Sequence, residues 1–291
     1  MQHLSASGSI PITHSIAPVT AGKVAWLVDI WGVMHNGVKP FAPAITACEK
    51  FRAAGGIVLL LSNAPRPAAG VAAQLDRIGV ARSAWDAIVS SGDAARAFVA
   101  RHAPGPVFHL GPERDLGLYD GLGVTLGTHE DAKAMVCTGL FDDETETPDD
   151  YGSLLSACAD RGLPMVCANP DLTVERGAKI IYCAGAVAAA YEAIGGSVIY
   201  AGKPHLPVYE MAFVELARLR GHTVEKQAVL AIGDGIRTDI AGAANAGIAS
   251  VYIASGVHLG SGGALDAALL ADLFPKGSPQ PVAAMAGLAW V

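Results

Sequence analysis

One segment near the N-terminus decides the fold: Val-Ala-Trp-Leu-Val-Asp-Ile-Trp-Gly-Val, residues 24–33. Residues 24–30 are apolar except for Asp29, which predicts a β-strand that is buried on both faces. Strands of this kind occur in parallel sheets that carry helices on both sides. Asp29 lies at the carboxyl end of the predicted strand, where ligands bind in parallel α/β sheets. The segment therefore predicts both a fold class and the edge of the sheet that carries a site.

Strand and helix patterns alternate after this segment and again near the C-terminus. Further buried strands are expected over 57–61, 87–90, 228–232 and 249–253, and helices over 43–54, 67–78, 92–101, 207–220 and 239–246. Glycines directly follow the first two of these helices and act as stop signals. This alternation predicts an α/β fold whose core is a Rossmann-like, doubly wound parallel sheet.

A second set of strands and helices interrupts this alternation. Ala-Pro-Gly-Pro at residues 103–106 is a strong break. After it come apolar runs at 107–110, 134–138 and 165–168, a helical pattern at 151–161 and an acidic stretch at 141–150 that we expect to be a solvated loop. We expect residues 1–103 and 199–291 to form the core, and residues 104–198 to form an inserted α/β cap domain.

The composition limits the classes of function. The chain has 291 residues, of which 52% are hydrophobic, and this is enough for two domains. A formal net charge of −7 disfavours nucleic acid and anionic membranes as partners. The five cysteines include no Cys-x-x-Cys pair, and the N-terminus has no secretory pattern, so we expect reduced thiols in a cytoplasmic protein. No apolar stretch approaches the ~20 residues of a membrane span.

The ends of the first two predicted strands carry groups that suit phosphoryl transfer. Asp29 is a candidate nucleophile, because a carboxylate can attack phosphorus and form an aspartyl phosphate. Gly32 suits a tight loop whose main-chain N–H groups approach an anion. Ser62 and Asn63 follow the second strand and can hydrogen-bond phosphate oxygens, although capping of the next helix is an equally ordinary role.

Two later segments supply the charges that such a site needs. Lys203 lies in Ala-Gly-Lys-Pro and is either a point charge for a phosphoryl group or a surface lysine in a turn. Gly-Asp-Gly-Ile-Arg-Thr-Asp, residues 233–239, places Asp234 after a buried strand and Asp239 at a helix start, where it is also a candidate N-cap. Because carboxylates and a phosphate dianion repel one another, their convergence predicts a Mg²⁺ ion.

Taken together, the four segments resemble those of the haloacid dehalogenase-like (HAD) superfamily of hydrolases, from about residue 24 to about residue 256. Within that superfamily the chain is similar to class IIA, the subgroup of the N-acetylglucosamine-metabolism, p-nitrophenyl and pyridoxal phosphatases. The resemblance implies Mg²⁺-dependent hydrolysis of a small phosphorylated metabolite through an aspartyl phosphate, and it allows a homodimer.

The resemblance also implies roles for individual residues. The metal would be held by Asp29, Asp234 and the main-chain carbonyl of Trp31, with support from Asp239. Phosphate would be bound by Gly32, Ser62, Asn63 and Lys203. Asn-Pro-Asp at residues 169–171 matches the substrate-facing loop of the subgroup's cap, which makes Asn169, Asp171 and the nearby Arg176 candidates for substrate selection. We expect His35 and Arg66 to line the mouth of the site.

Trp31 departs from the family pattern. Phosphatases of the family usually carry an aspartate two residues after the nucleophile, which protonates the leaving group. Three interpretations remain: a phosphatase that acts on good leaving groups or uses His35 as a substitute acid, a regulatory phosphate-binding protein with little or no activity, and a metal-free dehalogenase-like enzyme. Asp234 and Asp239 count against the last, because an enzyme without metal does not need them.

Two other classes are disfavoured by missing motifs. No Gly-x-Gly-x-x-Gly follows the first strand, which counts against a dinucleotide-binding domain. No Gly-x-Ser-x-Gly occurs, which counts against a Ser-His-Asp hydrolase of the α/β type.

Overall fold

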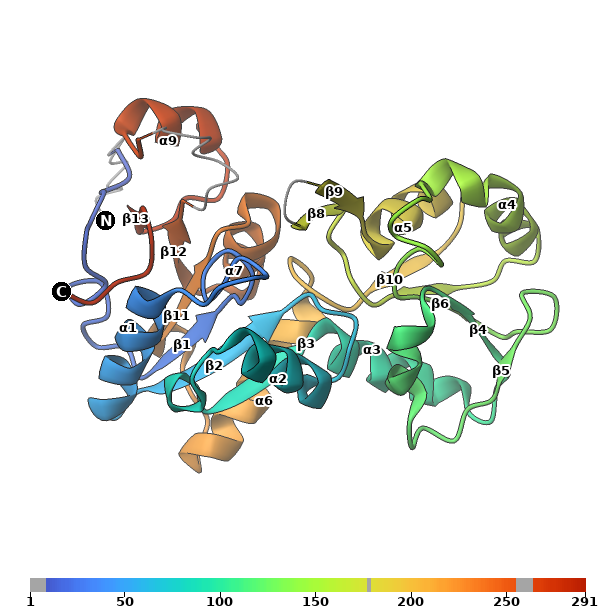
Figure 1. Ribbon diagram of the computed structural model, residues 1–291, viewed down its shortest axis with the longest axis horizontal. Helices are drawn as coiled ribbons and strands as arrows, with labels where there is room; N and C mark the ends of the chain where they lie inside the picture. The colour runs from blue at the N-terminus through green and yellow to red at the C-terminus, as the bar shows by residue number, and fades with distance from the viewer. Residues whose placement is uncertain (1–8, 177–178, 255–263) are drawn as a thin grey trace, which may run out of the picture.

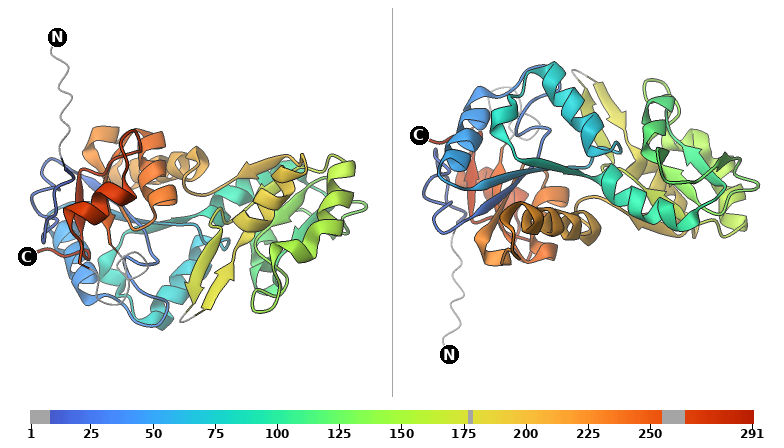
Figure 2. Two further views of the ribbon diagram at one scale, coloured as in Figure 1. Left: turned by 90° about the horizontal axis from the view of Figure 1, so that it is seen from above. Right: turned by 90° about the horizontal axis from the view of Figure 1, so that it is seen from below.

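The chain folds into two lobes that lie side by side, as the computed structural model shows for residues 9–176, 179–254 and 264–291 (Figure 1). The larger lobe is built from both ends of the chain and is called the core below. The smaller lobe, green to yellow in Figure 1, comes from the middle of the chain and is the inserted cap. The two views of Figure 2 show the same division.

The core contains a six-stranded sheet in which all neighbouring strands are parallel, in the order β13-β12-β11-β1-β2-β3. Its strands are β1 (Ala25–Val28), β2 (Ile57–Ser62), β3 (Ala87–Ser90), β11 (Val229–Gly233), β12 (Ala249–Ile253) and β13 (Ala283–Met285). The chain starts in the middle at β1, moves outward to β3, and later returns to lie beside β1 as β11. The strand order therefore reverses between β1 and β11, and ligands bind in α/β sheets at such a switch point.

Helices cover both faces of the core sheet, as a doubly wound fold requires. Along β1, Trp26 and Val28 pack toward α1 (Ala42–Ala53) and α2 (Ala68–Ile78). Ala25 and Leu27, which point the other way, pack in a cluster with residues of α3 (Ser91–Val99), α6 (Leu206–Arg220) and α7 (Ala241–Ala246). The prediction of a strand buried on both faces is confirmed, because successive side chains of a strand point to opposite sides.

The cap contains a second parallel sheet with the order β10-β7-β6-β4-β5. Its strands are β4 (Val107–Leu110), β5 (Leu126–Gly127), β6 (Met135–Cys137), β7 (Met165–Cys167) and β10 (Val198–Tyr200), and its helices are α4 (Gly152–Asp160) and α5 (Ala184–Ala193). An antiparallel hairpin of β8 (Thr173–Arg176) and β9 (Lys179–Tyr182) lies at the boundary between the lobes (Figure 2). The predicted cap boundary at residue 198 falls inside β10, which pairs with β7, so the cap sheet extends to Tyr200.

Helix α3 joins the two lobes, because it lies between the two sheets (Figure 1). In the cap sheet, Met135 and Cys137 of β6 face α4 and α5, whereas Val136 belongs to the same hydrophobic cluster as Ala95 and Val99 of α3. One face of the cap sheet is therefore covered by a helix of the core.

Several elements were not predicted from the sequence. They are α5, the β8–β9 hairpin, β5, β10, β13, α9 (Ala267–Leu273) and short 3₁₀ turns at η1 (Arg82–Ala84), η2 (Ala100–His102), η3 (Glu113–Tyr119), η4 (Pro148–Tyr151) and η5 (Lys226–Ala228). The helix expected from residue 239 is preceded by a π-helical turn, η6 (Ile236–Ile240), so the helical segment begins earlier than predicted. Within the described ranges, no helix is long and apolar enough to cross a membrane.

Candidate active site

Three carboxylates meet beyond the carboxyl ends of β1 and β11, where the strand order of the core reverses. Asp29 follows β1, Asp234 follows β11, and Asp239 lies in η6. Val28 pairs with Ile232 in register, which brings the ends of the two strands to the same level. One carboxylate oxygen from each of the three aspartates lies within 4.8 Å of the other two. The convergence expected from the parallel sheet is therefore present in the structure.

Two glycines allow the carboxylates to come this close. Gly32 has a left-handed backbone with φ +84°, and a Cβ placed on it would lie 2.0 Å from Oδ2 of Asp234. A Cβ on Gly233 would lie 2.2 Å from Cγ of Asp239. Any side chain at either position would therefore push an aspartate out of the cluster.

Lys203 is the cation at the centre of this cluster. Its ammonium group is buried and donates hydrogen bonds to Oδ1 of Asp29 at 2.5 Å and to Oδ1 of Asp239 at 2.8 Å. It also donates to the main-chain oxygen of Leu61 at 3.1 Å. Three acceptors thus hold the Lys203 ammonium beside the carboxylate of Asp29. Because the side chain is buried, the interpretation of Lys203 as a surface lysine is wrong.

The charges of the cluster do not balance. Burial raises the pKa of Asp29, Asp239 and Asp234 raise it further, and Lys203 opposes the shift. Burial lowers the pKa of Lys203, but Asp239 and Asp29 outweigh it, so the pKa lies well above its usual value. One ammonium facing three carboxylates leaves excess negative charge among oxygen ligands, and a hard divalent cation fits this donor set.

Ser62 and Asn63 follow β2 but differ in their contacts. The Ser62 hydroxyl oxygen accepts a hydrogen bond from the Ala64 N–H at 3.1 Å, which leaves its own hydrogen for an anion. The Asn63 amide donates to the Lys203 carbonyl at 3.1 Å and to Oδ1 of Asp171 at 2.9 Å. Its oxygen accepts from the Lys203 N–H at 2.8 Å. Both amide hydrogens of Asn63 are used within the protein, so the geometry does not favour its side chain as a phosphate ligand.

Trp31 is half-buried and packs against its own loop. A Cβ on Gly37, where φ is +86°, would lie 2.5 Å from the indole ring, so the ring covers the main chain there. The ring of His35 meets the indole edge-on, with centroids 5.2 Å apart. The indole of Trp31 thus braces the loop after β1.

His35 does not have the properties of a proton donor at neutral pH. It is buried, and its Nδ1 accepts a hydrogen bond from the Gly37 N–H at 2.8 Å. Burial lowers its pKa to about 4. A neutral imidazole with this hydrogen bond supports the loop, so the geometry counts against the predicted role of His35 as substitute acid.

The remaining predicted residues, Arg66, Asn169, Asp171 and Arg176, are not members of the carboxylate cluster. Arg66 donates a hydrogen bond to Gln74 of α2 at 2.7 Å. Asn169 shapes its own loop by accepting from the Asp171 N–H at 3.1 Å. Asp171 reaches the core through Asn63. Arg176 ends β8, and its side chain is outside the part of the chain that the structure describes.

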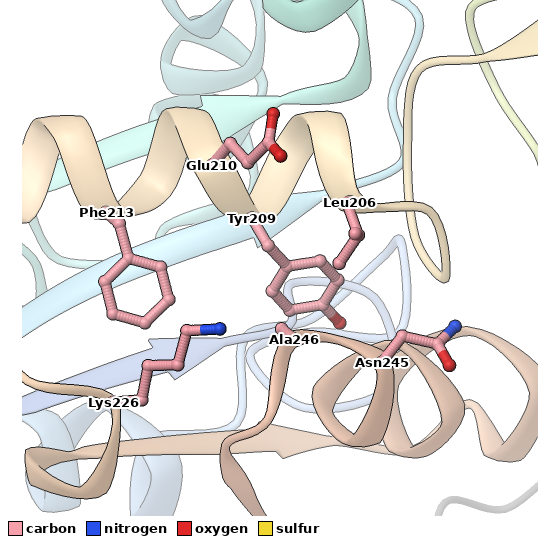
Figure 3. Close-up of a pocket in the computed structure, with 7 residues that line it drawn as sticks. All are labelled: Leu206, Tyr209, Glu210, Phe213, Lys226, Asn245 and Ala246. Carbon is pink, nitrogen blue, oxygen red and sulfur yellow. The ribbon is translucent and has the colours of Figure 1, made fainter.

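Tyr209 adjoins the site and was not expected from the sequence. Its hydroxyl lies 3.5 Å from the main-chain oxygen of Asp239, and a Cβ on Gly242 would meet that hydroxyl at 2.4 Å. Tyr209 also lines a surface pocket of about 350 Å³, together with Leu206, Glu210, Phe213, Lys226, Asn245 and Ala246 (Figure 3). None of the three aspartates lines this pocket, so it is separate from the carboxylate cluster.

Comparison with known proteins places this geometry in a family. The sequence model of the haloacid dehalogenase-like hydrolases matches residues 26–125, and a second, HAD-hydrolase-like model matches residues 200–272. The crystal structure of a hydrolase of the haloacid dehalogenase-like family from Brucella suis is 43% identical, with a TM-score of 0.85, over 95% of this chain and all of the other.

Further matches come from Mycobacterium tuberculosis. The D-glycerol 3-phosphate phosphatase is 29% identical over 235 residues, which are 80% of this chain but only 63% of the relative's length. The crystal structure of a glycerol phosphate phosphatase in complex with magnesium is 26% identical, with a TM-score of 0.68, over 94% of this chain and 77% of the other. The site lies at the switch point of a doubly wound core that carries an inserted cap, and the matches cover both parts of the core. The chain therefore belongs to the haloacid dehalogenase-like hydrolase family, with the architecture of its class IIA members.

Proposed function

We propose that the protein is a Mg²⁺-dependent phosphatase that hydrolyses a small phosphorylated metabolite, with Asp29 as the nucleophile. The observation that carries the proposal is the Lys203 ammonium held 2.5 Å from the Asp29 carboxylate, with Asp234 and Asp239 in the same cluster. A buried carboxylate beside a fixed cation suits nucleophilic attack on phosphorus.

The reaction would take place in two steps. In the first, an Asp29 oxygen bonds to phosphorus while the bond from phosphorus to the leaving oxygen breaks, which yields an aspartyl phosphate and an oxyanion that takes its proton from water. In the second, a water molecule attacks phosphorus while the bond from phosphorus to the Asp29 oxygen breaks, which releases inorganic phosphate with the protons of that water and restores the carboxylate. Lys203 would offset the charge on the phosphoryl oxygens, and the Ser62 hydroxyl would donate to one of them.

Asp29 and Asp234 would hold the metal, with Asp239 next to them and the Trp31 carbonyl as a further proposed ligand. Bound there, Mg²⁺ would neutralise phosphoryl charge and orient the substrate. The fit rests on the donor set itself, three carboxylates whose oxygens lie within 4.8 Å of one another.

Trp31 restricts the leaving groups that this site can expel. An indole cannot protonate the departing oxygen, and loss of a general acid typically costs ~10²–10⁴ in rate. We therefore expect aryl and acyl phosphates to be hydrolysed faster than alkyl phosphates. The matches to glycerol phosphate phosphatase from Mycobacterium tuberculosis support a small phosphorylated metabolite as the substrate.

A hydrolysis screen with and without Mg²⁺ tests the proposal. It would compare p-nitrophenyl phosphate and acetyl phosphate with sugar, polyol, nucleotide and cofactor phosphates. Asp29→Asn should abolish turnover of every substrate, because the amide is a poor nucleophile. Asp160→Asn, on the exposed face of α4, is the matched control and should leave turnover unchanged.

Turnover that persists in Asp29→Asn would rule out the aspartyl-phosphate route. A second candidate function, a phosphate-binding regulatory protein, is favoured by Trp31 alone. It predicts that the wild-type protein binds inorganic phosphate and Mg²⁺ in calorimetry but hydrolyses none of the panel.

A further inference from the structure

We propose that Asp171 of the cap is a positioning residue for Lys203, and that it acts through Asn63 of the core. Sequence reasoning made Asp171 a residue that selects substrate. The hydrogen bonds instead connect the Asp171 carboxylate, through the side-chain amide of Asn63, to the main chain of Lys203.

Asp171 is fixed on its own side before it meets the core. Its N–H donates to Oδ1 of Asn169 at 3.1 Å, and its carbonyl accepts from the Gly185 N–H at the start of α5 at 3.1 Å. A Cβ on Gly185 would lie 2.2 Å from the Pro170 oxygen, so the loop rests directly on the helix. Asp171 therefore presents its carboxylate from a rigid support.

Asn63 has only two amide hydrogens, and the structure uses both. One goes to Oδ1 of Asp171 at 2.9 Å, and the other goes to the Lys203 carbonyl at 3.1 Å. The Asn63 oxygen accepts from the Lys203 N–H at 2.8 Å, so the amide holds both polar main-chain groups of Lys203. Without an acceptor at Asp171, one amide hydrogen of a buried side chain would lose its partner, which is costly.

The packing around Gly202 shows how closely the cap meets this amide. A Cβ on Gly202 would lie 2.5 Å from Oδ1 of Asn63 and 2.8 Å from Cδ of Pro170. Gly202, the residue before Lys203, therefore lies against both the Asn63 amide and the cap loop. The docking of the cap on the core and the position of Lys203 are therefore linked by direct contacts.

The alternative role for Asp171 is that of the missing general acid. Burial raises its pKa, whereas the hydrogen bond from Asn63 and the charge of Lys203 lower it, and Asp239 raises it. The two roles differ in what an isosteric amide does. Asparagine at residue 171 can still accept from Asn63, but it has no acidic proton to give.

Hydrogen exchange of the Lys203 amide tests the positioning role directly in the full-length protein. Asp171→Ala should speed exchange of this amide ~10- to 100-fold, the effect of losing one hydrogen bond to a charged group. Asp171→Asn should restore the rate to within about threefold of wild type. If Asp171→Ala does not fold, Asp171→Leu, which has nearly the same shape, gives the same comparison. Unchanged exchange in Asp171→Ala, or equal rates in the alanine and asparagine variants, would overturn the proposal.

The catalytic consequence rests on the proposed function and is measured separately. Asp171→Ala should lower kcat/KM ~10- to 100-fold, and adding it to Asn63→Ala should cause no further loss, since both act on one lysine. Asp171→Asn should match wild type on p-nitrophenyl phosphate and on glycerol 3-phosphate alike. A loss in Asp171→Asn confined to the alkyl phosphate would instead assign Asp171 as the acid and overturn the positioning role. If the wild-type protein hydrolyses none of the phosphates in the screen, the proposed function fails, and the exchange of the Lys203 amide still decides the positioning role.

Discussion

At the scale of single residues, Trp31 is the substitution with the clearest chemical consequence. It lies two positions beyond the proposed nucleophile, and its ring covers the main chain of Gly37 and meets His35 edge-on. The indole therefore contributes to the shape of the loop after β1, and it has no acidic proton to give to a leaving group.

We predict that Trp31→Asp raises hydrolysis of alkyl phosphates by up to ~10²-fold, because it restores an acid at that position. Hydrolysis of p-nitrophenyl phosphate should change little, since its leaving group needs no proton. The measurement is kcat for both substrates. Trp31→Asn is the matched control, because it opens the loop equally but carries no acid. Equal rates in the aspartate and asparagine variants would show that the acid is not what the site lacks.

His35 leads to a prediction about stability and pH. Its pKa is about 4 in the folded protein, against an ordinary value of 6.5. Between these values the unfolded chain binds a proton that the folded protein does not, so stability is complete above pH 6.5 and falls as the pH drops toward 4. At ~1.4 kcal/mol per pH unit, the loss from this residue is at most about 3.5 kcal/mol.

Urea denaturation at pH 7 and at pH 4.5 measures this effect. His35→Asn keeps an acceptor for the Gly37 N–H but does not titrate in this range, so it should lose less stability on acidification than wild type. His222→Asn, at an exposed position, should lose as much as wild type. The interpretation fails if the two variants respond alike.

At the scale of elements, the site depends on how closely the loop after β1 approaches the end of β11. Gly32 and Gly22 both have left-handed backbones, with φ +84° and φ +74°, but only Gly32 lies against another residue's side chain, that of Asp234. The pair therefore separates the cost of backbone strain from the effect of crowding on the carboxylates.

We predict that Gly32→Ala and Gly22→Ala each lower the free energy of unfolding by ~1–2 kcal/mol, the cost of a left-handed alanine. Only Gly32→Ala should weaken Mg²⁺ binding, by ~10-fold or more, because Asp234 must move. Calorimetric titration with Mg²⁺ measures the affinity. Equal Mg²⁺ affinity in the two variants would exclude Asp234 from the metal site.

Sequence reasoning predicted the elements that follow simple patterns and missed those that depend on tertiary contacts. The strands β1, β2 and β11 are buried apolar runs, and their parallel arrangement alone implies that Asp29 and Asp234 converge. Helix α5 has the sequence Ala-Gly-Ala-Val-Ala-Ala-Ala-Tyr-Glu-Ala, which is apolar nearly all round and shows no helical periodicity. The contact of Asp171 with Asn63 depends on how the cap docks on the core, and the contact of Tyr209 with Asp239 depends on helix packing. No local sequence pattern predicts either contact.

At the scale of the whole molecule, the core and the cap share one hydrophobic cluster. Leu118 in η3 and Val166 in β7 of the cap pack in the same cluster as Ala95 and Val99 of α3 in the core, and all four side chains are buried. An interface of this kind favours unfolding of the two lobes as one cooperative unit.

Tryptophan fluorescence can test this cooperativity, because all four tryptophans, Trp26, Trp31, Trp85 and Trp290, belong to the core lobe. We predict that Leu118→Ala in the cap lowers the free energy of unfolding reported by these core residues by ~2–4 kcal/mol, the cost of a cavity in a packed cluster. Leu116→Ala, in the same turn but 37% exposed, should cost less than ~1 kcal/mol. If the cap unfolded independently, Leu118→Ala would leave the fluorescence transition unchanged while far-ultraviolet circular dichroism showed a second, earlier transition. A shared shift in both signals would mean that the cap unfolds together with the core. The cap contacts that support Asp171 and Lys203 would then be as stable as the core itself.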